Sequence, residues 1–99
     1  MTIASPVISI CCRGYAEIPV SVTFDDDAEK TARWSAYIKE RPSSPVMANF
    51  DVSSKDGKVV LTMASGKTNR LPVGQFLYFI EASVAAKKFQ AQGYVNVQL

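Results

Sequence analysis

Histidine is absent from this 99-residue chain, and its two cysteines are the adjacent Cys11 and Cys12. Without histidine the chain lacks the commonest general base and the commonest metal ligand, and no Ser-His-Asp triad can be built. Two cysteines cannot supply a four-ligand zinc site or a framework of several disulfides. These absences argue against most enzyme classes, so we expect a protein that is not an enzyme, with no catalytic residue, no metal and no cofactor.

The chain also lacks a large excess of charge of one sign and long apolar runs. Eleven Lys and Arg against nine Asp and Glu leave a net charge of +2, too little for a nucleic-acid footprint. The sequence contains no run of 18 apolar residues, the length needed to span a membrane. No basic residue precedes Arg13, so the apolar start does not fit a secretory signal. We expect synthesis in a reducing cytoplasm, and no nucleic-acid or membrane partner.

What the chain does contain is apolar residues at every second position, the period of a half-buried strand. Its 99 residues, 47% of them apolar, suit one domain over residues 1–99. The pattern predicts about seven short strands, joined by turns, in an antiparallel β-sandwich of the all-β class. These strands fall at 7–12, 18–24, 32–39, 46–52, 59–63, 75–82 and 89–99.

Proline and glycine mark the connections between the strands. Residues 42–45 form a turn, and Asp56-Gly57 suits a tight hairpin. The longer connection 64–74, which contains Pro72 and Gly74, can hold one helical turn around residues 67–71, and residues 84–88 turn again. Pro19 places its strand at an edge or at its start. Gly93 predicts a bulge or a close approach of another group.

The alternation also divides the strand residues into two faces. A thin core around Trp34 is predicted from the inward positions: Ile18, Val20, Val22, Phe24, Trp34, Ile38, Phe50, Leu61, Phe76, Tyr78, Ile80, Phe89, Val95 and Val97. The adjacent cysteines, which point to opposite faces of a strand, should include one buried and one exposed thiol.

Several large apolar side chains fall on the outward side instead. They are Tyr37, Val60, Leu77, Phe79 and Tyr94. If these side chains cluster, they form an apolar patch typical of a protein–protein interface. The alternative is that they pack beneath the connection 64–74.

Two other features are tested against a chemical role. Asp25, Asp26, Asp27 and Glu29 could offer oxygen ligands to calcium, but the spacing and glycine of an EF-hand loop are missing. A solvated turn explains them better. Gly66-Lys67-Thr68 lacks the earlier glycine of a phosphate-binding loop and has no βαβ unit around it, so we assign it no phosphate site.

The order of motifs resembles a known family. Arg13-Gly14 precedes an alternating strand, a strand around Trp34 follows, and the second half reads GKVVLT at 57–62, LPVGQFLYFI at 71–80 and QGYVNV at 92–97. Over residues 8–99 the chain is similar to small immunoglobulin-like β-sandwich proteins of tailed bacteriophages. These include the N-terminal domain of baseplate upper proteins and short head- or tail-associated proteins. The motifs contain turn and core positions, and no catalytic residue is carried over.

The resemblance implies a virion structural protein. Baseplate proteins continue into a long C-terminal region, whereas this chain stops at the end of the sandwich, so we expect a separate accessory protein. Its expected partners are other copies of itself and the major capsid, connector or tail proteins, with capsid decoration favoured over the head–tail or tail location. The alternative function is a carbohydrate- or host-surface-binding module, which would require exposed aromatic residues. Trp34, the single tryptophan, alternates in phase with core positions.

Overall fold

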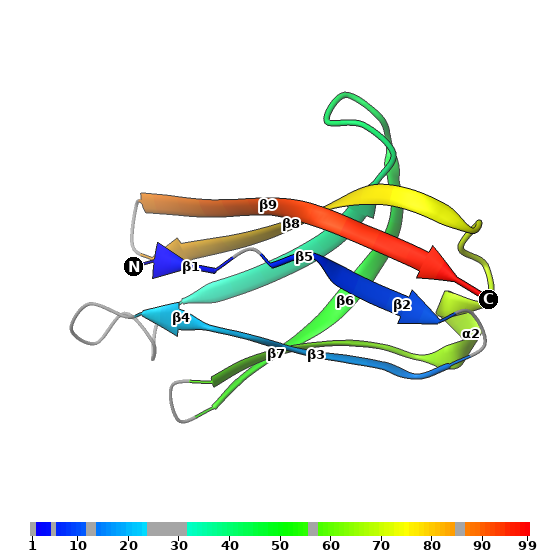
Figure 1. The fold of residues 1–99 in the computed structure, drawn as a ribbon. Helices are drawn as coiled ribbons and strands as arrows, with labels where there is room; N and C mark the ends of the chain where they lie inside the picture. The colour runs from blue at the N-terminus through cyan, green and yellow to red at the C-terminus, as the bar shows by residue number, and fades with distance from the viewer. Residues whose placement is uncertain (1, 5, 12–13, 24–31, 56–57, 85–86) are drawn as a thin grey trace.

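The computed structural model describes residues 2–4, 6–11, 14–23, 32–55, 58–84 and 87–99 (Figure 1). Within them, nine strands and one short helix follow one another along the chain. The elements are β1 (Thr2–Ile3), β2 (Ile8–Cys11), β3 (Ala16–Val20), β4 (Val22–Thr23), β5 (Arg33–Lys39), β6 (Val46–Lys55), β7 (Lys58–Met63), α2 (Ser65–Thr68), β8 (Gly74–Val84) and β9 (Lys87–Gln98).

The strands form two layers that share β6. The hydrogen-bonded order is β2-β9-β8-β5-β6-β7-β3, and β1 pairs separately with β4. The first half of β6 pairs with β5 up to Phe50, and the second half pairs with β7 from Asp51 onward. In Figure 1, β9, β8 and β5 lie in the upper layer, and β7 and β3 lie in the lower one. The expected all-β sandwich is confirmed.

One strand pair departs from the expected antiparallel arrangement. β2 runs parallel to β9, with Ile8 opposite Val95 and Ile10 opposite Val97. Alternation along one strand does not encode the direction of its neighbour, so the sequence pattern could not predict this pair. β3 lies at the other edge of the order and contains Pro19, as expected for a residue without a backbone donor.

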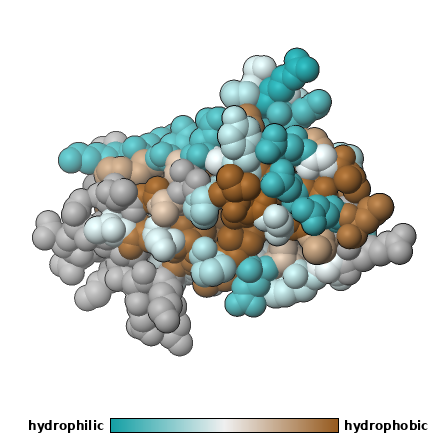
Figure 2. All heavy atoms as spheres, in the orientation of Figure 1, coloured by the Kyte–Doolittle hydropathy of each residue, from teal (hydrophilic) through white to brown (hydrophobic). Residues whose placement is uncertain are grey.

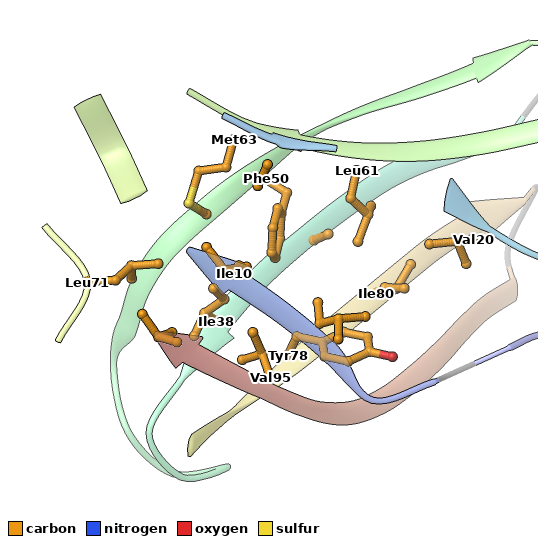
Figure 3. Packing of buried hydrophobic residues seen from close by; sticks show 14 of the residues in the cluster. Ile10, Val20, Ile38, Phe50, Leu61, Met63, Leu71, Tyr78, Ile80 and Val95 are labelled. Atoms are coloured by element: carbon orange, nitrogen blue, oxygen red, sulfur yellow. The ribbon is translucent and has the colours of Figure 1, made fainter. Parts of the chain in front are cut away.

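The core fills the space between the layers, and both layers contribute alternate residues to it (Figure 3). Ile38, Leu61 and Ile80 are completely buried. The predicted core residues that are buried are Val20, Ile38, Phe50, Leu61, Tyr78, Ile80, Val95 and Val97. The partly buried ones that pack against the cluster are Ile18, Val22, Trp34 and Phe76. Phe24 lies outside the described residues.

Phe89 was placed in the core by its alternation, but it is only half-buried. It pairs with Ala82 near the start of β9, away from the central cluster. Other buried side chains are absent from the predicted core: Ile8, Ile10, Ala16, Ala36, Val59, Met63 and Leu71. Several of these are small or lie in short segments, where alternation alone gives a weak signal.

The connections match the turn signals with small shifts. Lys55 pairs with Lys58 at the ends of β6 and β7, and the predicted turn residues Asp56 and Gly57 lie outside the described part. β8 and β9 extend into the predicted turn 84–88, because Val84 pairs with Lys87 and Ser83 with Lys88. The helical turn begins earlier, at Ser65, and hydrogen-bonded turns continue to Leu71. β6 extends three residues beyond the predicted end at Val52.

Thr68 anchors this connection to the rest of the domain. Its side chain is fully buried, and its hydroxyl donates to the carbonyl of Gly14 at 2.8 Å. This bond satisfies a buried polar group and joins α2 to the segment after β2. Gly74, at the start of β8, has a φ of 153°, in the positive region where glycine is favoured.

Gly93 and Tyr78 lie in close contact across two neighbouring strands. They are paired residues of β9 and β8, and a Cβ atom at Gly93 would lie 2.6 Å from the Tyr78 ring. The ring therefore occupies the space that a side chain at position 93 would need. The Tyr78 hydroxyl donates to the carbonyl of Pro6, in the segment before β2. The close approach predicted at Gly93 is therefore the contact with the Tyr78 ring.

Candidate interaction surface

The outer face of the upper layer bears several large apolar side chains. We define the outer face as the outward residues of β5, β8 and β9, together with Asn49 of β6. Strand pairing aligns them in three rows across the strands. The central row is Asn49–Tyr37–Phe79–Gln92, one flanking row is Lys39–Leu77–Tyr94, and the other is Ser35–Glu81–Gln90. Each row therefore crosses β5, β8 and β9.

Two aromatic rings stack at the centre of the outer face. The centroids of Tyr37 and Phe79 are 5.4 Å apart, with an interplanar angle of 22°. The Lys39 ammonium lies 5.2 Å from the Tyr37 centroid and 5.7 Å from the Phe79 centroid. Both distances are within the range of a cation–π interaction. The lysine therefore covers the stack with its alkyl chain and leaves a positive charge above it.

Glu81 accepts hydrogen bonds from three neutral side chains on the same face. The Tyr37 hydroxyl donates at 2.9 Å, and Ser35 and Gln90 donate at 3.4 Å each. Desolvation, followed by the hydrogen bond to Glu81 and the charge of that carboxylate, raises the pKa of Tyr37 above its ordinary value. The tyrosine is therefore held in its neutral, donating form.

Leu77 and Tyr94 form the wall of a shallow depression beside the central stack. The two residues are cross-strand partners, and Tyr94 is 52% exposed. The depression has a volume of about 240 Å³ and is lined by Glu40, Arg41, Pro42, Gln75, Phe76, Leu77, Gln92 and Tyr94. It is smaller than the pockets that usually enclose a small ligand. An exposed aromatic residue beside a shallow hollow is more typical of a protein contact surface.

The outward residues predicted to cluster do so only in part. Tyr37, Leu77, Phe79 and Tyr94 share the outer face. Val60 does not, because it lies on β7 between Pro19 and Ser53, in the lower layer. Phe79 faces outward yet is only 6% exposed, since Tyr37 and Lys39 lie against it. The alternative, that these residues pack beneath connection 64–74, does not account for this cover.

The polar members of the outer face were missed from the sequence. Lys39, Glu81 and Gln90 define its charge and hydrogen bonding, but they were not among the predicted interface residues. The signal was available, because Lys39 and Glu81 have the same strand parity as Tyr37 and Phe79. Alternation within a strand does not give the pairing register, and it is the register that brings residues of different strands together.

The other candidate chemical groups are placed as follows. Cys11 is exposed, while Cys12 and the acidic residues 25–27 and 29 lie outside the described part of the chain. Among the described residues, no group of three or more potential metal ligands is found. No helix in that same part is long and apolar enough to cross a bilayer. Trp34 packs against the core.

No family model matches the chain, and no curated protein matches it. Solved structures do. Titin domain M1 matches with a TM-score of 0.61 at 10% identity, over 98% of this chain and 93% of that one. The chain has an immunoglobulin-like fold. A titin M10 complex with obscurin-like 1 matches with a TM-score of 0.55 at 17% identity, over 94% and 84% of the two chains.

A bacterial structure shares this immunoglobulin-like fold. The fimbrial subunit AggA of Escherichia coli matches with a TM-score of 0.54 at 12% identity, covering 98% of this chain and 93% of that one. At such low identities the similarity is one of fold. These neighbours carry no information on a phage origin.

Proposed function

We propose that this chain is a non-enzymatic structural protein of a tailed bacteriophage virion, which binds capsid or head–tail and tail proteins. The supporting observation is the outer face, where a stacked aromatic pair and the exposed Tyr94 lie on a sheet surface. Ser35, Asn49, Gln90, Gln92 and Tyr94 are exposed on this face. The family resemblance supports the virion context.

The chemistry of the surface supports adhesion rather than catalysis. Gln, Asn and Tyr side chains surround the apolar centre, and such groups form hydrogen bonds at low desolvation cost. Two strand edges, at β2 and β3, are available in addition. On a symmetric lattice, many identical weak contacts add to a stable attachment. We favour capsid decoration because the domain is small.

Co-sedimentation with virion assemblies tests this proposal. Purified chain is mixed with capsids, and separately with tails, of the phage whose genes flank this one. Binding to one of these assemblies is expected. Tyr94→Ala should weaken it about tenfold, because an exposed aromatic residue that becomes buried in an interface contributes on the order of 1–2 kcal/mol.

Tyr15→Ala is the matched control. Tyr15 is 63% exposed and lies between β2 and β3, away from the outer face. Its loss should leave binding unchanged. The proposal fails if the chain sediments with neither assembly, and the assignment of the face fails if both tyrosine variants bind like the unmodified protein.

The alternative of carbohydrate binding requires exposed aromatic residues that form a flat platform, and Trp34 is the single tryptophan that could contribute to one. Trp34 instead shares the inner face of β5 with Ala36 and Ile38 and packs against the core. A sugar platform at Trp34 is therefore not favoured by its position. Glycan binding and the thermal midpoint can be measured for Trp34→Ala. If the variant keeps both, the glycans bind at another site.

A further inference from the structure

We propose that the free backbone edge of β6 over residues 46–50 binds an extended, acidic segment of a partner protein as an added strand. We define the β6 groove as this edge together with the depression that adjoins it. The inference goes beyond the proposed function, because it uses the backbone edge of β6 rather than the outer face and defines its partner by chemistry. The two proposals can therefore fail separately.

The first half of β6 has a hydrogen-bonded neighbour on one side only. It pairs with β5 up to Phe50, and the pairing of β6 with β7 begins at Asp51. No other described strand pairs with the first half, so its second side presents backbone N–H and C=O groups without ladder partners. This edge is additional to those of β2 and β3 at the two ends of the strand order.

The composition of this edge favours the addition of a strand. Natural edge strands often carry charged side chains that prevent pairing with another chain. Residues 46–50 read VMANF and carry no charge. Val46 is 45% exposed and Met47 is 36% exposed, so apolar surface accompanies the unpaired backbone. A shift of register at Met47 leaves residues 48–50 in regular pairing with β5.

A shallow depression adjoins the edge. It has a volume of about 200 Å³ and is lined by Met47, Ala48 and Asn49 of β6 and by Lys67, Arg70 and Leu71 of the connection after β7. Leu71 belongs to the core cluster, so this apolar wall is fixed in place (Figure 3). The depression is smaller than the pockets that usually enclose a small ligand. It suits individual side chains of an extended segment better than a separate molecule.

The charge of the β6 groove defines its partner. Lys67 and Arg70 are exposed, and the lining of the depression contains no acidic residue. Hydrogen-bonded turns and the bond from Thr68 to the Gly14 carbonyl hold their segment in place. Two cations on a fixed segment, beside an uncharged edge, complement carboxylates and repel basic side chains. A second copy docked by the same edge would bring its own two cations, so an acidic segment is the favoured occupant.

Synthetic peptides test the inference on the full chain. The probe is a labelled peptide of about seven residues in which valine and glutamate alternate, long enough to cover the edge at about 3.3 Å per residue. Fluorescence anisotropy should show saturable binding with a Kd below about 1 mM. A peptide with lysine in place of glutamate should bind at least about tenfold more weakly. N-methylation of every backbone amide of the acidic peptide removes its ladder donors and should weaken binding at least about tenfold.

Charge reversal in the chain is the complementary test. Lys67→Glu combined with Arg70→Glu should weaken binding of the acidic peptide at least about tenfold and make the groove prefer the lysine peptide. Lys87→Glu combined with Lys88→Glu is the matched control. Both lysines are exposed at the start of β9, at the opposite end of the domain from α2 (Figure 1). The control should keep the Kd within about threefold, because distant charges are screened by salt. Circular dichroism verifies that each variant is folded.

Hydrogen–deuterium exchange locates the bound peptide. The unpaired amides among residues 46–50 should exchange more slowly when the acidic peptide is present, and the edges of β2 and β3 should be unaffected. Protection at β2 or β3 instead would place the peptide elsewhere and overturn the inference.

Four binding results also overturn the inference. They are no saturable binding up to about 1 mM peptide, equal binding of the acidic and lysine peptides, equal binding of the N-methylated peptide, and charge-reversed grooves that bind like the unmodified chain. A chain that binds the acidic peptide in this way but no virion assembly overturns the proposed function alone. A chain that co-sediments with capsids or tails but does not bind the peptide overturns this inference alone.

Discussion

The inner and outer faces of the sheet formed by β5, β8 and β9 both carry a tyrosine that donates a hydrogen bond. On the inner face, Tyr78 is almost completely buried and donates to the Pro6 carbonyl. On the outer face, Tyr37 is half-buried and donates to Glu81. The inner ring is enclosed by strands of both layers, whereas the outer ring is covered by single side chains of its own sheet.

The difference shows that an apolar side chain can be removed from water without entering the core. Phe79 points outward and is 6% exposed, as little as the core residue Phe50. Its cover consists of the side chains of Tyr37 and Lys39, which belong to its own sheet. Perturbations of the inner face should therefore reduce stability more than perturbations of the outer face.

The largest effect is expected at Gly93. Gly93→Ala places a methyl group 2.6 Å from the Tyr78 ring, so the ring must move and its hydroxyl must leave Pro6. Overpacking and the lost hydrogen bond should together lower the free energy of unfolding by about 2–4 kcal/mol. Thermal denaturation measures this as a fall in Tm of at least about 10 °C.

Gly66→Ala is the matched control for this substitution. A Cβ atom at Gly66 meets nothing within 4 Å, and Gly66 lies within α2. Alanine is favoured over glycine in helices by up to about 1 kcal/mol, so this variant should keep or slightly raise the Tm. Equal Tm values for both alanine variants would show that the Tyr78 ring does not require glycine at position 93.

The second effect separates the two tyrosines. Tyr78→Phe leaves the Pro6 carbonyl without this donor and should cost about 1–2 kcal/mol, measured by chemical denaturation. Tyr37→Phe removes a bond at a partly solvated carboxylate and should cost about 0.5–1 kcal/mol. A larger loss at Tyr37 would contradict the contrast between the two faces.

The pH dependence follows from the same tyrosines. Burial raises the pKa of Tyr78, and burial together with Glu81 raises the pKa of Tyr37, both above 10.0. The folded state therefore keeps these protons where the unfolded chain loses them. This stabilisation is complete below pH 10 and is lost as the pH rises through the folded-state pKa values. Either Tyr→Phe variant should show a smaller fall in Tm between about pH 9 and pH 11 than the unmodified chain.

The smallest effect is expected at Lys39. Lys39→Ala removes a cation from above two rings and uncovers part of Phe79, which should cost about 0.5–1 kcal/mol in chemical denaturation. Lys88→Ala, an exposed change near the start of β9, should cost less than about 0.5 kcal/mol. If the two variants are equally stable, Lys39 does not protect the aromatic stack.

Much of the fold could be predicted from the sequence, because alternation reports directly which side chains face inward. The strands around Trp34, Leu61 and Ile80 were located in this way, and Pro19 indicated an edge. The parallel pairing of β2 with β9 could not be predicted, since strand direction depends on the path of the whole chain. The division of β6 between the two layers could not be predicted either, because its apolar residues follow one continuous pattern.

The candidate surface was predicted less completely, for a related reason. Leu77, Phe79 and Tyr94 could be assigned to the outward side, but no single strand shows which layer a residue belongs to. Val60 was therefore grouped with residues of the opposite sheet. Lys39 and Glu81 could be assigned to the outer face only when the register placed them on either side of the Tyr37–Phe79 row.

The passage of β6 from one layer to the other also determines how this domain can come apart. Along that side the two layers are joined by the continuous backbone of β6, while on the opposite side they are joined by the two-residue ladder of β1 with β4 and by the hydrogen bond from the Ala4 amide to the Ser21 carbonyl. Partial unfolding should therefore begin at this short ladder, while β6 still holds the layers together. The amides of β1 and β4 should exchange with deuterium early, and the paired amides of β6 last.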